Sequence, residues 1–422
     1  MFCSFQKGVG LMSSFNIHLL CTGDLHLGRH PSKIPEVYDS QEFSPGQIWK
    51  KIVQKAINLK VDAVIITGDI VDRKNRFYEA FGPFEAGVKQ LEKNEISVFV
   101  IAGNHDYDVL SDLSRNFNSD YFTFLNSEKG WDHQQLYKNG EPVLNVIGWS
   151  YQNRHVYKNP LTNLNIPESN CPTIGLLHTE VDNPGSNYAP VDCDQLLETD
   201  ITGWCLGHIH QPSLISKPPG FILNPGSPQP LDPGETGSHG VWEIEVKSEN
   251  RIEISKIPLA SIKYYHLEID VSGLKLAEDL TAFISDNIRQ QLSSDLNKNW
   301  IPKQVLMRIT LIGRTKFSRE IDKKINRIIE ELNLNIAGSR VLIEKINNET
   351  RPQLNLEELQ GGKTPVALIA EYLIKLKEDR EDELPESLVK QVKKKLLSAY
   401  DSNAYTPLRT QNWIDPPEEK DV

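Results

Sequence analysis

Residues 17–28 read IHLLCTGDLHLG, a short apolar run that leads directly into a glycine, an aspartate and a histidine. A run of this length, bounded by turn-forming residues, predicts a buried strand, so the polar residues fall where that strand ends. Residues two apart in extended backbone point the same way, and Asp24 and His26 can therefore face one ion.

Four further motifs place metal-ligand residues directly after strand-like runs. They are Gly68-Asp69, Gly103-Asn104-His105-Asp106, Leu177-His178-Thr179 and Gly207-His208-Ile209-His210. Carboxylate, amide and imidazole donors without a thiolate suit Mn²⁺, Mg²⁺, Fe²⁺ or Zn²⁺, and seven donors are too many for one octahedral ion. Two ions that share a ligand fit the set better. Such a pair clamps the attacking and leaving oxygens of a phosphoryl displacement, so the sequence predicts phosphoester hydrolysis.

Each motif also has an ordinary interpretation when it stands alone. A lone Gly-Asp is usually a turn, and a single histidine such as His178 is more often a hydrogen-bonded residue near the core. The order of five motifs at strand ends between residues 24 and 210 makes the metal interpretation the better one. Arg29 and His30 follow the first motif closely enough to touch a substrate, although a solvated turn explains them at least as well.

The alternation of strand-like and helix-like segments predicts an α/β layered domain over residues 12–257. Ser44-Pro45 begins a helix on which apolar residues recur every three or four positions. Gly82-Pro83 precedes a second predicted helix, which extends from Phe84 to Glu95. From residue 143 to 257 strands are denser and helices rarer, which predicts a more antiparallel or mixed sheet.

Two smaller regions follow this domain. Residues 258–346 read strand, helix, strand, helix, and they predict a small α/β domain. Residues 347–422 are expected to form a helical tail, in which Thr364-Pro365 begins one helix and Pro385 begins another. At the other end of the chain, residues 1–11 carry no periodic pattern and are expected to be a disordered tail.

Composition is typical of a globular protein. Hydrophobic residues make up 39% and charged residues 24% of the 422 residues, far from the profile of a disordered chain. No apolar stretch reaches the ~18–20 residues of a membrane span, and the first residues lack the pattern of a signal peptide. The five cysteines include no CxxC pair, which argues against disulfides and thiolate zinc sites. We expect a cytoplasmic protein without membrane contact. The net charge of −11 argues against a broad nucleic-acid-coating surface, but not against a phosphodiester held on metal ions.

The ordered set Asp-x-His, Gly-Asp, Gly-Asn-His-Asp, His and Gly-His-x-His resembles the motifs of the calcineurin-like metallophosphoesterases, over residues 16–246. The resemblance implies a four-layer α/β/β/α sandwich with the metals at the carboxyl ends of strands. It implies one ion held by Asp24, His26, Asp69 and His210, and another held by Asp69, Asn104, His178 and His208. His105 would then act on the scissile phosphate as an acid or a charge-stabilising donor, Asp106 would orient it, and a metal-activated hydroxide would be the nucleophile.

The residues around the motifs resemble a narrower group, the SbcD-type DNA repair exonucleases. The stretches concerned are residues 23–28, 68–73, 206–212, 224–228 and 240–246. This resemblance implies a Mn²⁺-dependent DNA exonuclease, with endonuclease activity as a second option, that works with an SMC-like coiled-coil ATPase subunit. The second domain would cap the site and help to select DNA. The apolar faces of the C-terminal helices would dock the ATPase or pack on the chain's own core.

Other functions are compatible with the same motifs. A phosphodiesterase or phosphatase for a small nucleotide-type substrate would use all five, although the residues after 257 are more than such an enzyme needs. A non-catalytic scaffold with a degenerate metal site is weakened because all seven donors and His105 are present. By analogy, a homodimer would bury an apolar helical patch of the catalytic domain between two copies. Asp72 stands where the eukaryotic relatives carry a histidine. A second histidine that acts on the phosphate is therefore not expected at this position.

Overall fold

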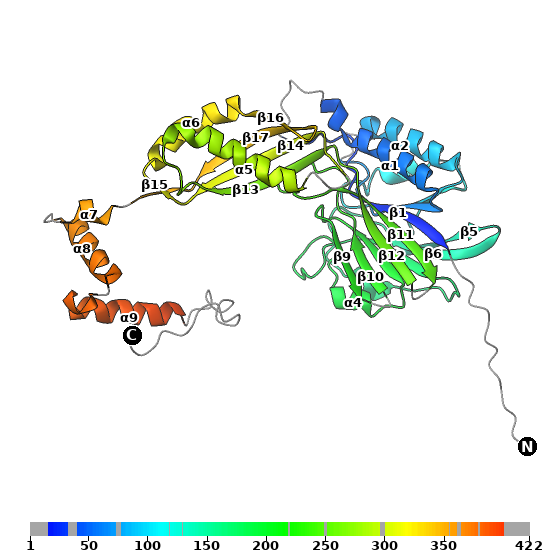
Figure 1. Ribbon diagram of the computed structural model, residues 1–422. Coiled ribbons are helices and arrows are strands. Elements are labelled where there is room, and N and C mark those ends of the chain that lie inside the picture. Colours follow the sequence, from blue (N-terminus) through cyan, green and yellow to red (C-terminus); the bar gives the residue numbers. More distant parts are fainter. Residues whose placement is uncertain are drawn as a thin grey trace, which may run out of the picture. The chain divides into compact units, whose positions relative to one another are not determined.

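Figure 1 shows the chain as a computed structural model. The structure describes residues 16–32, 40–72, 77–117, 119–128, 130–217, 220–248, 251–295, 300–353, 355–360, 364–378 and 380–400. These residues form two compact units. The first contains the described residues up to Gly313 together with Arg319–Thr350, and the second contains Arg314–Ser318 and the described residues from Arg351 onward. The predicted tail over residues 1–11 lies outside the described residues.

The first of two six-stranded sheets has the strand order β12-β11-β1-β2-β3-β4. Its strands are β1 (Ile17–Thr22), β2 (Ala63–Ile66), β3 (Ser97–Val100), β4 (Phe122–Phe124), β11 (Gly240–Ser248) and β12 (Arg251–Pro258). The strand predicted from residue 17 is thus confirmed. Strands β1 to β4 run parallel, with Thr22 opposite Ile66 and Ile66 opposite Val100. Their carboxyl ends therefore lie together at one edge of the sheet.

The second sheet has the order β5-β6-β7-β8-β10-β9. Its strands are β5 (Trp131–Lys138), β6 (Glu141–Trp149), β7 (Thr173–His178), β8 (Gly203–Gly207), β9 (Ser213–Lys217) and β10 (Gly220–Asn224). The four central strands run parallel, and the edge strands β5 and β9 are antiparallel to their neighbours. The mixed arrangement predicted for this part of the chain is confirmed.

Two helices and three apolar clusters of the described residues build the layers. Helices α1 (Pro45–Leu59) and α2 (Phe77–Glu92) cover the outer face of the first sheet (Figure 1), with the rings of Trp49 and Phe84 stacked 5.3 Å apart. A second core, which includes Leu19 and Ile174, lies between the sheets. The short helix α4 (Cys193–Leu197) and irregular segments cover the outer face of the second sheet. The short helix α3 (Leu110–Ser114) follows β3. The predicted α/β sandwich is confirmed, and its fourth layer is thin.

Helix α2 differs from its prediction at both ends. It begins at Phe77, with Pro83 inside the helix, and ends at Glu92. A proline at this position removes one backbone hydrogen bond, which is why the sequence favoured a start behind it. Buried Ala80 nevertheless continues the apolar face of Phe84 and Val88 towards the amino end of the helix. Packing of this face against the core therefore outweighs the cost of the internal proline.

A four-stranded sheet with the order β13-β14-β17-β16 forms the small domain. Its elements are β13 (Ile262–Asp270), α5 (Leu280–Asp295), β14 (Gln304–Ile312), α6 (Ser318–Glu331), β16 (Asn333–Ile336) and β17 (Ser339–Asn348). Strands β13, β14 and β17 are parallel, and β16 pairs antiparallel with β17. Phe43, which precedes α1, packs with Tyr264 and Leu306 of this sheet in a small apolar cluster.

The sequence predicted two of these four strands and missed β16 and β17. The register of β17 against β14 shifts between Met307 and Arg308, which interrupts the simple alternation that identifies a strand. Residue 346, the predicted end of the domain, lies inside β17.

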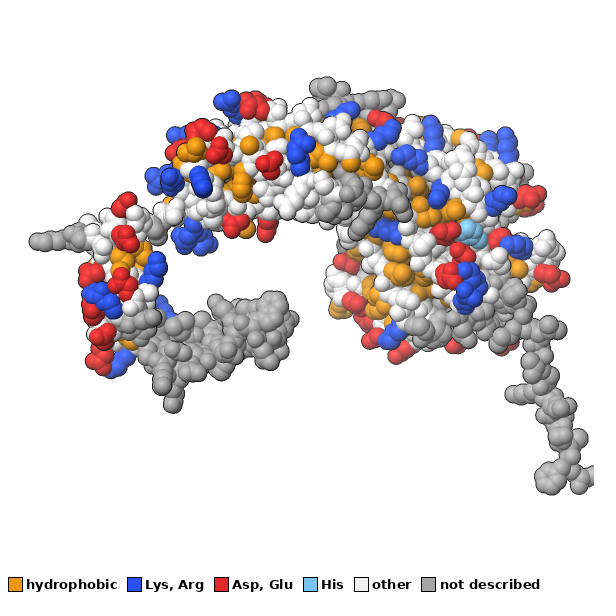
Figure 2. All heavy atoms as spheres, in the orientation of Figure 1, with side chains coloured by type: hydrophobic (Ala, Val, Ile, Leu, Met, Phe, Trp, Pro, Cys, Tyr) orange, Lys and Arg blue, Asp and Glu red, His pale blue; other side chains and the backbone are white. Residues whose placement is uncertain are grey.

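The second unit consists of short paired strands and helices. Its elements are β15 (Arg314–Thr315), β18 (Arg351–Pro352), α7 (Leu356–Leu359), α8 (Pro365–Lys377) and α9 (Glu386–Tyr400). The predicted start of α8 is confirmed, since the Thr364 side chain accepts a hydrogen bond from the backbone N–H of Ala367 at 3.2 Å. Val366, Ile369, Leu373 and Leu376, the predicted apolar face, are 38–57% exposed, and hydrophobic side chains are visible at this surface in Figure 2. Among the described residues, no helix has the length and apolarity that a membrane span requires.

Candidate metal centre

The candidate ligands lie at the edge where strands of both sheets end. Asp24 and His26 follow β1, Asp69 follows β2, Asn104 follows β3, His178 ends β7, and His208 and His210 follow β8. Hydrogen bonds join the two sheets here: Nδ1 of His178 lies 2.9 Å from the carbonyl oxygen of Thr67, and the backbone N–H of His208 donates to Asp24 at 3.1 Å. The structure therefore brings together all seven donors, which are spread over nearly two hundred residues of sequence.

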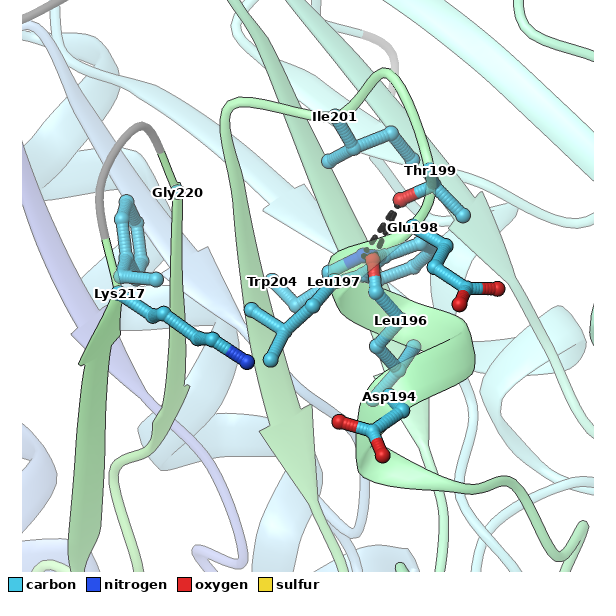
Figure 3. A pocket seen from close by; sticks show the side chains of 10 residues that line it. Asp194, Leu196, Leu197, Glu198, Thr199, Ile201, Trp204, Lys217 and Gly220 are labelled. Carbon is cyan, nitrogen blue, oxygen red and sulfur yellow. Dashed lines mark hydrogen bonds between the residues drawn. The ribbon is translucent and has the colours of Figure 1, made fainter.

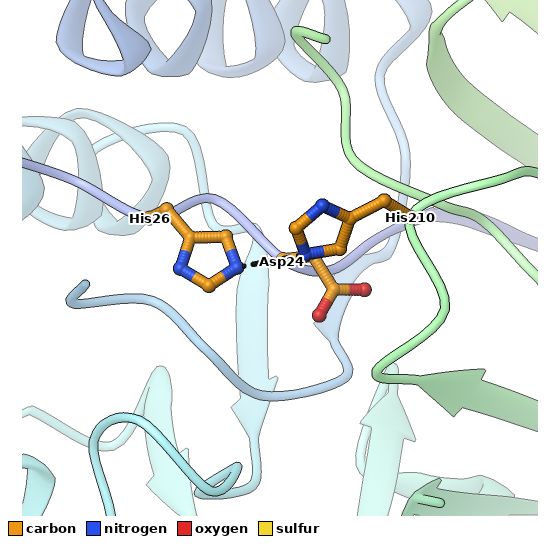
Figure 4. Close-up of side chains that lie close together, drawn as sticks. All are labelled: Asp24, His26 and His210. Atoms are coloured by element: carbon orange, nitrogen blue, oxygen red, sulfur yellow. Dashed lines mark hydrogen bonds between the residues drawn. The ribbon is translucent and has the colours of Figure 1, made fainter. Parts of the chain in front are cut away.

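One cluster consists of Asp24, His26 and His210. The rings of the two histidines converge beside the carboxylate of Asp24, and their Nε2 atoms are 3.0 Å apart (Figure 4). Asp24 and His26 are buried, and His210 is half-buried. Two imidazole nitrogens and a carboxylate oxygen that meet in this way could hold one cation.

A second cluster surrounds Asn104. Its Oδ1 lies 3.0 Å from Nε2 of His178 and 3.1 Å from Nδ1 of His208. Asp69 lies between the clusters, because its Oδ2 is 3.4 Å from Nε2 of His178 and 3.8 Å from Nε2 of His26. One carboxylate oxygen thus faces histidines of both groups.

The hydrogen bonds of His178 test whether a cation fits this cluster. Nδ1 of His178 faces a backbone carbonyl, which only accepts, so Nδ1 carries the proton. The Nε2 atom of the neutral ring then has only a lone pair, yet it faces the oxygens of Asn104 and Asp69. A cation among these three atoms satisfies all of them, so the donor set fits a bound metal ion.

Electrostatics in the protein alone favour positive charge at two of the candidate histidines, whereas burial and the charge of His178 lower the pKa of His208 to about 3. Burial lowers the pKa of His178, but the charge and hydrogen bond of Asp69 and the charge of Asp24 raise it to about 9. For His210, burial likewise lowers the pKa, and Glu235, Asp24 and Asp69 raise it to about 9. Burial raises the pKa of Asp69, whereas the charges of three neighbouring histidines hold it well below its usual value. Without metal His178 and His210 therefore bind protons, which a divalent ion displaces when it binds.

The backbone at the site adopts unfavourable conformations. Asp24, His26, Asp69 and His208 have φ angles of 48°, 46°, 51° and 94°, in the left-handed region that residues with a Cβ seldom occupy. Such conformations cost of order 1–3 kcal/mol each, and they persist where the surrounding structure holds them in place. Four of the seven candidate ligands therefore sit in strained turns, as is common at functional sites.

His105 and Asp106 lie beside the clusters. Nδ1 of His105 donates to the backbone carbonyl of Asp72 at 2.7 Å, and burial lowers the pKa of this histidine. Its ring also forms a group with His26 and the carboxylate of Asp72 that could hold an ion. Asp106 is fully buried and accepts hydrogen bonds from the backbone N–H groups of Gly103 (2.8 Å) and Ile70 (2.7 Å). Asp106 thus fixes the loops after β2 and β3, and the Asp72 carbonyl orients the ring of His105.

The remaining predicted residues lie at the margin. Arg29 pairs with Asp232, and His30 is exposed. Nδ1 of His26 lies 3.4 Å from the carboxylate of Asp72, which places Asp72 beside both a candidate ligand and His105. This proximity gives Asp72 a place in the site, although the sequence suggested only a missing histidine.

Sequence reasoning missed Glu235, which lies 3.0 Å from Nδ1 of His210. Glu235 stands in a turn-rich stretch with no strand before it, so the pattern that revealed the other residues was absent. No local signal identified it, because a glutamate in a stretch of glycine and proline is usually a solvated turn residue.

A separate hollow opens on the outer side of the second sheet, beside α4 and β8 (Figure 3). Trp204 lies at its base and donates from Nε1 to the carbonyl of Leu196 at 3.0 Å and to Thr199 at 3.1 Å. Asp194, Glu198 and Lys217 contribute charges to its rim, and no predicted site residue lines it. The hollow is therefore distinct from the metal centre.

Comparison with known families agrees with this geometry. Residues 17–212 match the model of the calcineurin-like phosphoesterase family. This match supports the resemblance of the chain to the calcineurin-like metallophosphoesterases. Residues 264–351, which include the small sheet, match the middle domain of the metallophosphoesterase YhaO. The name of this family denotes phosphoester hydrolysis, and the two clusters contain side chains that could hold the metal ions of such a reaction.

Relatives extend the likeness beyond this domain. The uncharacterized metallophosphoesterase YhaO of Bacillus subtilis is 24% identical over 318 residues, which cover 74% of this chain and 75% of YhaO. The DNA double-strand break repair protein Mre11 of Methanocaldococcus jannaschii is 25% identical over 217 residues, 48% of this chain and 54% of that protein. Mre11 of Nanoarchaeum equitans is 29% identical over 113 residues, 26% of this chain and 30% of that protein.

Gly103 provides a test of how closely Asp69 must be held. A Cβ at Gly103 would lie 2.2 Å from Oδ1 and 2.8 Å from the backbone nitrogen of Asp69. We expect Gly103→Ala to displace this carboxylate and weaken Mn²⁺ binding by about tenfold or more, measured by isothermal titration calorimetry. The matched control is Gly82→Ala in α2, where nothing lies within 4 Å of the new Cβ. It should retain Mn²⁺ binding; equal binding by both variants would contradict the prediction.

Proposed function

We propose that the chain is a metal-dependent DNA nuclease, chiefly an exonuclease, which hydrolyses phosphodiester bonds with two bound divalent ions, Mn²⁺ in first place. The observation that carries the proposal is the position of Asp69. Its Oδ2 faces His178 at 3.4 Å and His26 at 3.8 Å, so one carboxylate can serve both ions. Its Oδ1 accepts the backbone N–H of His105 at 2.9 Å, which fixes the carboxylate between the clusters.

The residues divide the work of hydrolysis. Two divalent ions supply Lewis acidity and lower the pKa of a bound water towards neutrality. Asp24, His26 and His210 would hold one ion, Asn104, His178 and His208 would hold the other, and Asp69 would contribute to both. The ring of His105 has its Nδ1 engaged by the Asp72 carbonyl, which leaves Nε2 for the phosphate or the leaving oxygen. In this arrangement His105 acts on the substrate and Asp106 keeps the loop of His105 in place.

Support for DNA as the substrate comes from the relatives and from the second domain. The chain is similar to proteins named for DNA double-strand break repair, at 25% and 29% identity. A domain of four strands and two helices follows the catalytic domain, and a small substrate does not require it. The net charge of −11 opposes unassisted DNA binding, so the proposal includes local compensation by the two ions.

The proposal also includes a partner, an SMC-like coiled-coil ATPase, and a homodimer as the assembly. The exposed apolar face of α8 supports a protein partner, because five large aliphatic side chains of this helix, Leu368 included, are 38–57% exposed. Co-purification of the full chain with a coiled-coil ATPase, lost when Ile369 and Leu373 are changed to Ser, would support this part of the proposal. Unchanged co-purification of that variant would contradict the assignment to α8.

A substrate comparison tests the proposed activity. The purified full chain with Mn²⁺ is given linear duplex DNA, single-stranded DNA and a generic small phosphodiester in parallel. Release of mononucleotides or short oligonucleotides that requires Mn²⁺ would support the nuclease. Cleavage of the small diester alone, with or without an ATPase partner, would replace the proposal by a small-substrate phosphodiesterase.

A further inference from the structure

The segment between β10 and β11 reaches the metal centre through one buried carboxylate. Glu235 is 8% exposed, and both of its oxygens have partners. Oε1 lies 3.0 Å from Nδ1 of His210. Oε2 accepts hydrogen bonds from the Ser227 hydroxyl at 2.6 Å and from the backbone N–H of Leu231 at 3.2 Å. A carboxylate held this firmly against a candidate ligand requires an explanation.

We propose that Glu235 is a positioning residue of the metal centre, which fixes the tautomer and orientation of His210. An ionised carboxylate only accepts hydrogen bonds, so Nδ1 of His210 must carry the proton. When an ion displaces the second proton of the ring, the lone pair resides on Nε2, which points to Nε2 of His26 at 3.0 Å, where the candidate ion would bind. A carboxylate behind a ligating histidine also raises the basicity of that ligand.

Contacts on the rest of the segment hold Glu235 in place. Asp232 pairs with Arg29, only three residues after His26. The carbonyl of Pro233 accepts a hydrogen bond from Nε2 of His266 on β13, at 3.1 Å. Thr236 forms an isolated bridge with Tyr264 on the same strand. The segment is thus anchored to the loop after β1 and to the small domain, and the position of Glu235 depends on both.

A purely structural ion pair is the competing explanation. In that case Glu235 would neutralise a protonated His210, and its loss would lower the stability of the fold without a selective effect on metal binding. The two explanations predict different results. A positioning role lowers the affinity for divalent ions beyond any loss of stability in the metal-free chain, whereas a structural ion pair lowers the stability without a selective effect on that affinity.

The test compares Glu235→Gln with the wild-type full chain by titration with Mn²⁺ alone. Glutamine keeps the shape but loses the charge, and we expect Mn²⁺ to bind about 10–100-fold more weakly to one of the two positions, the usual effect of removing such a partner. Thermal unfolding of the metal-free variant is measured in parallel. Ser227→Ala removes the hydroxyl that supports Glu235 and keeps the backbone N–H that donates to the carbonyl of His210 at 3.0 Å. It should produce a smaller loss and serves if Glu235→Gln does not fold.

Glu344→Gln is the matched control, because Glu344 is equally buried at its side chain (11% against 10%) and pairs with Arg308 on the small domain. It should bind Mn²⁺ like the wild type. Wild-type affinity in both Glu235→Gln and Ser227→Ala would overturn the inference, as would a loss of affinity that only follows a loss of stability. The inference rests on the proposed function, because it assumes that the chain binds two ions. If the wild type bound no Mn²⁺, the proposed function and the inference would both fail. If the wild type bound Mn²⁺ and the variants bound it equally well, only the role of Glu235 would be refuted.

Discussion

Asp69→Asn is expected to lose bound metal and hydrolysis together. The variant keeps the size of the side chain but removes the charge between His178 and His26, whose Nε2 atoms lie 3.4 and 3.8 Å from Oδ2. An amide cannot bridge two cations as a carboxylate does, so both ions should bind more weakly. We expect fewer than two Mn²⁺ per chain by elemental analysis. Turnover should fall by more than about a hundredfold, since the charges that stabilise the transition state leave with the ions.

Asp112→Asn on α3 controls for the chemistry of the substitution. Asp112 is exposed and pairs only with neighbouring residues of its own helix and the turn after it, among the contacts of the described residues. It should retain two ions and full turnover. Full metal occupancy in Asp69→Asn would show that this carboxylate does not bridge the ions, and a loss in both variants would point to general damage by the substitution.

The sequence was sufficient to predict much of the site because the chemistry lies at strand ends. A buried run followed by Gly-Asp or Gly-His fixes both where the chain turns and which side chains it presents, and parallel strands bring such turns to one edge. His178 and Asp24 could therefore be predicted to lie close together although they belong to different sheets. Hydrogen bonds across the sandwich, such as that of His178 with Thr67, account for this proximity.

Features that depend on tertiary packing were not predictable in this way. Helix α2 passes through Pro83 because its apolar face packs against α1, and no local signal outweighs a proline. Strand β17 was missed because its alternation breaks at a register shift against β14. Glu235 carries no strand-end signal, and its role emerges only from a contact with His210 across 25 residues. In each case a long-range contact determines the structure, and short-range patterns do not contain it.

His105→Ala is expected to separate metal binding from catalysis. The ring does not belong to the two clusters around Asp69, and its Nδ1 is engaged by the Asp72 carbonyl at 2.7 Å. The side chain is 29% exposed, so one end of the ring can meet a substrate. We expect two Mn²⁺ per chain to remain, with hydrolysis reduced by at least about a hundredfold, the usual loss when an acid or a charge-stabilising donor is removed.

The outcome of this substitution also decides between two roles for His105. An ion could also bind among His26, Asp72 and His105. In that case His105→Ala would remove one of its ligands. A fall in metal content alongside turnover would therefore place His105 among the ligands, and unchanged turnover would remove it from the mechanism. His133→Ala, at an exposed residue of β5, is the matched control and should change neither quantity. Retained metal with lost turnover is the one combination that a role towards the phosphate predicts.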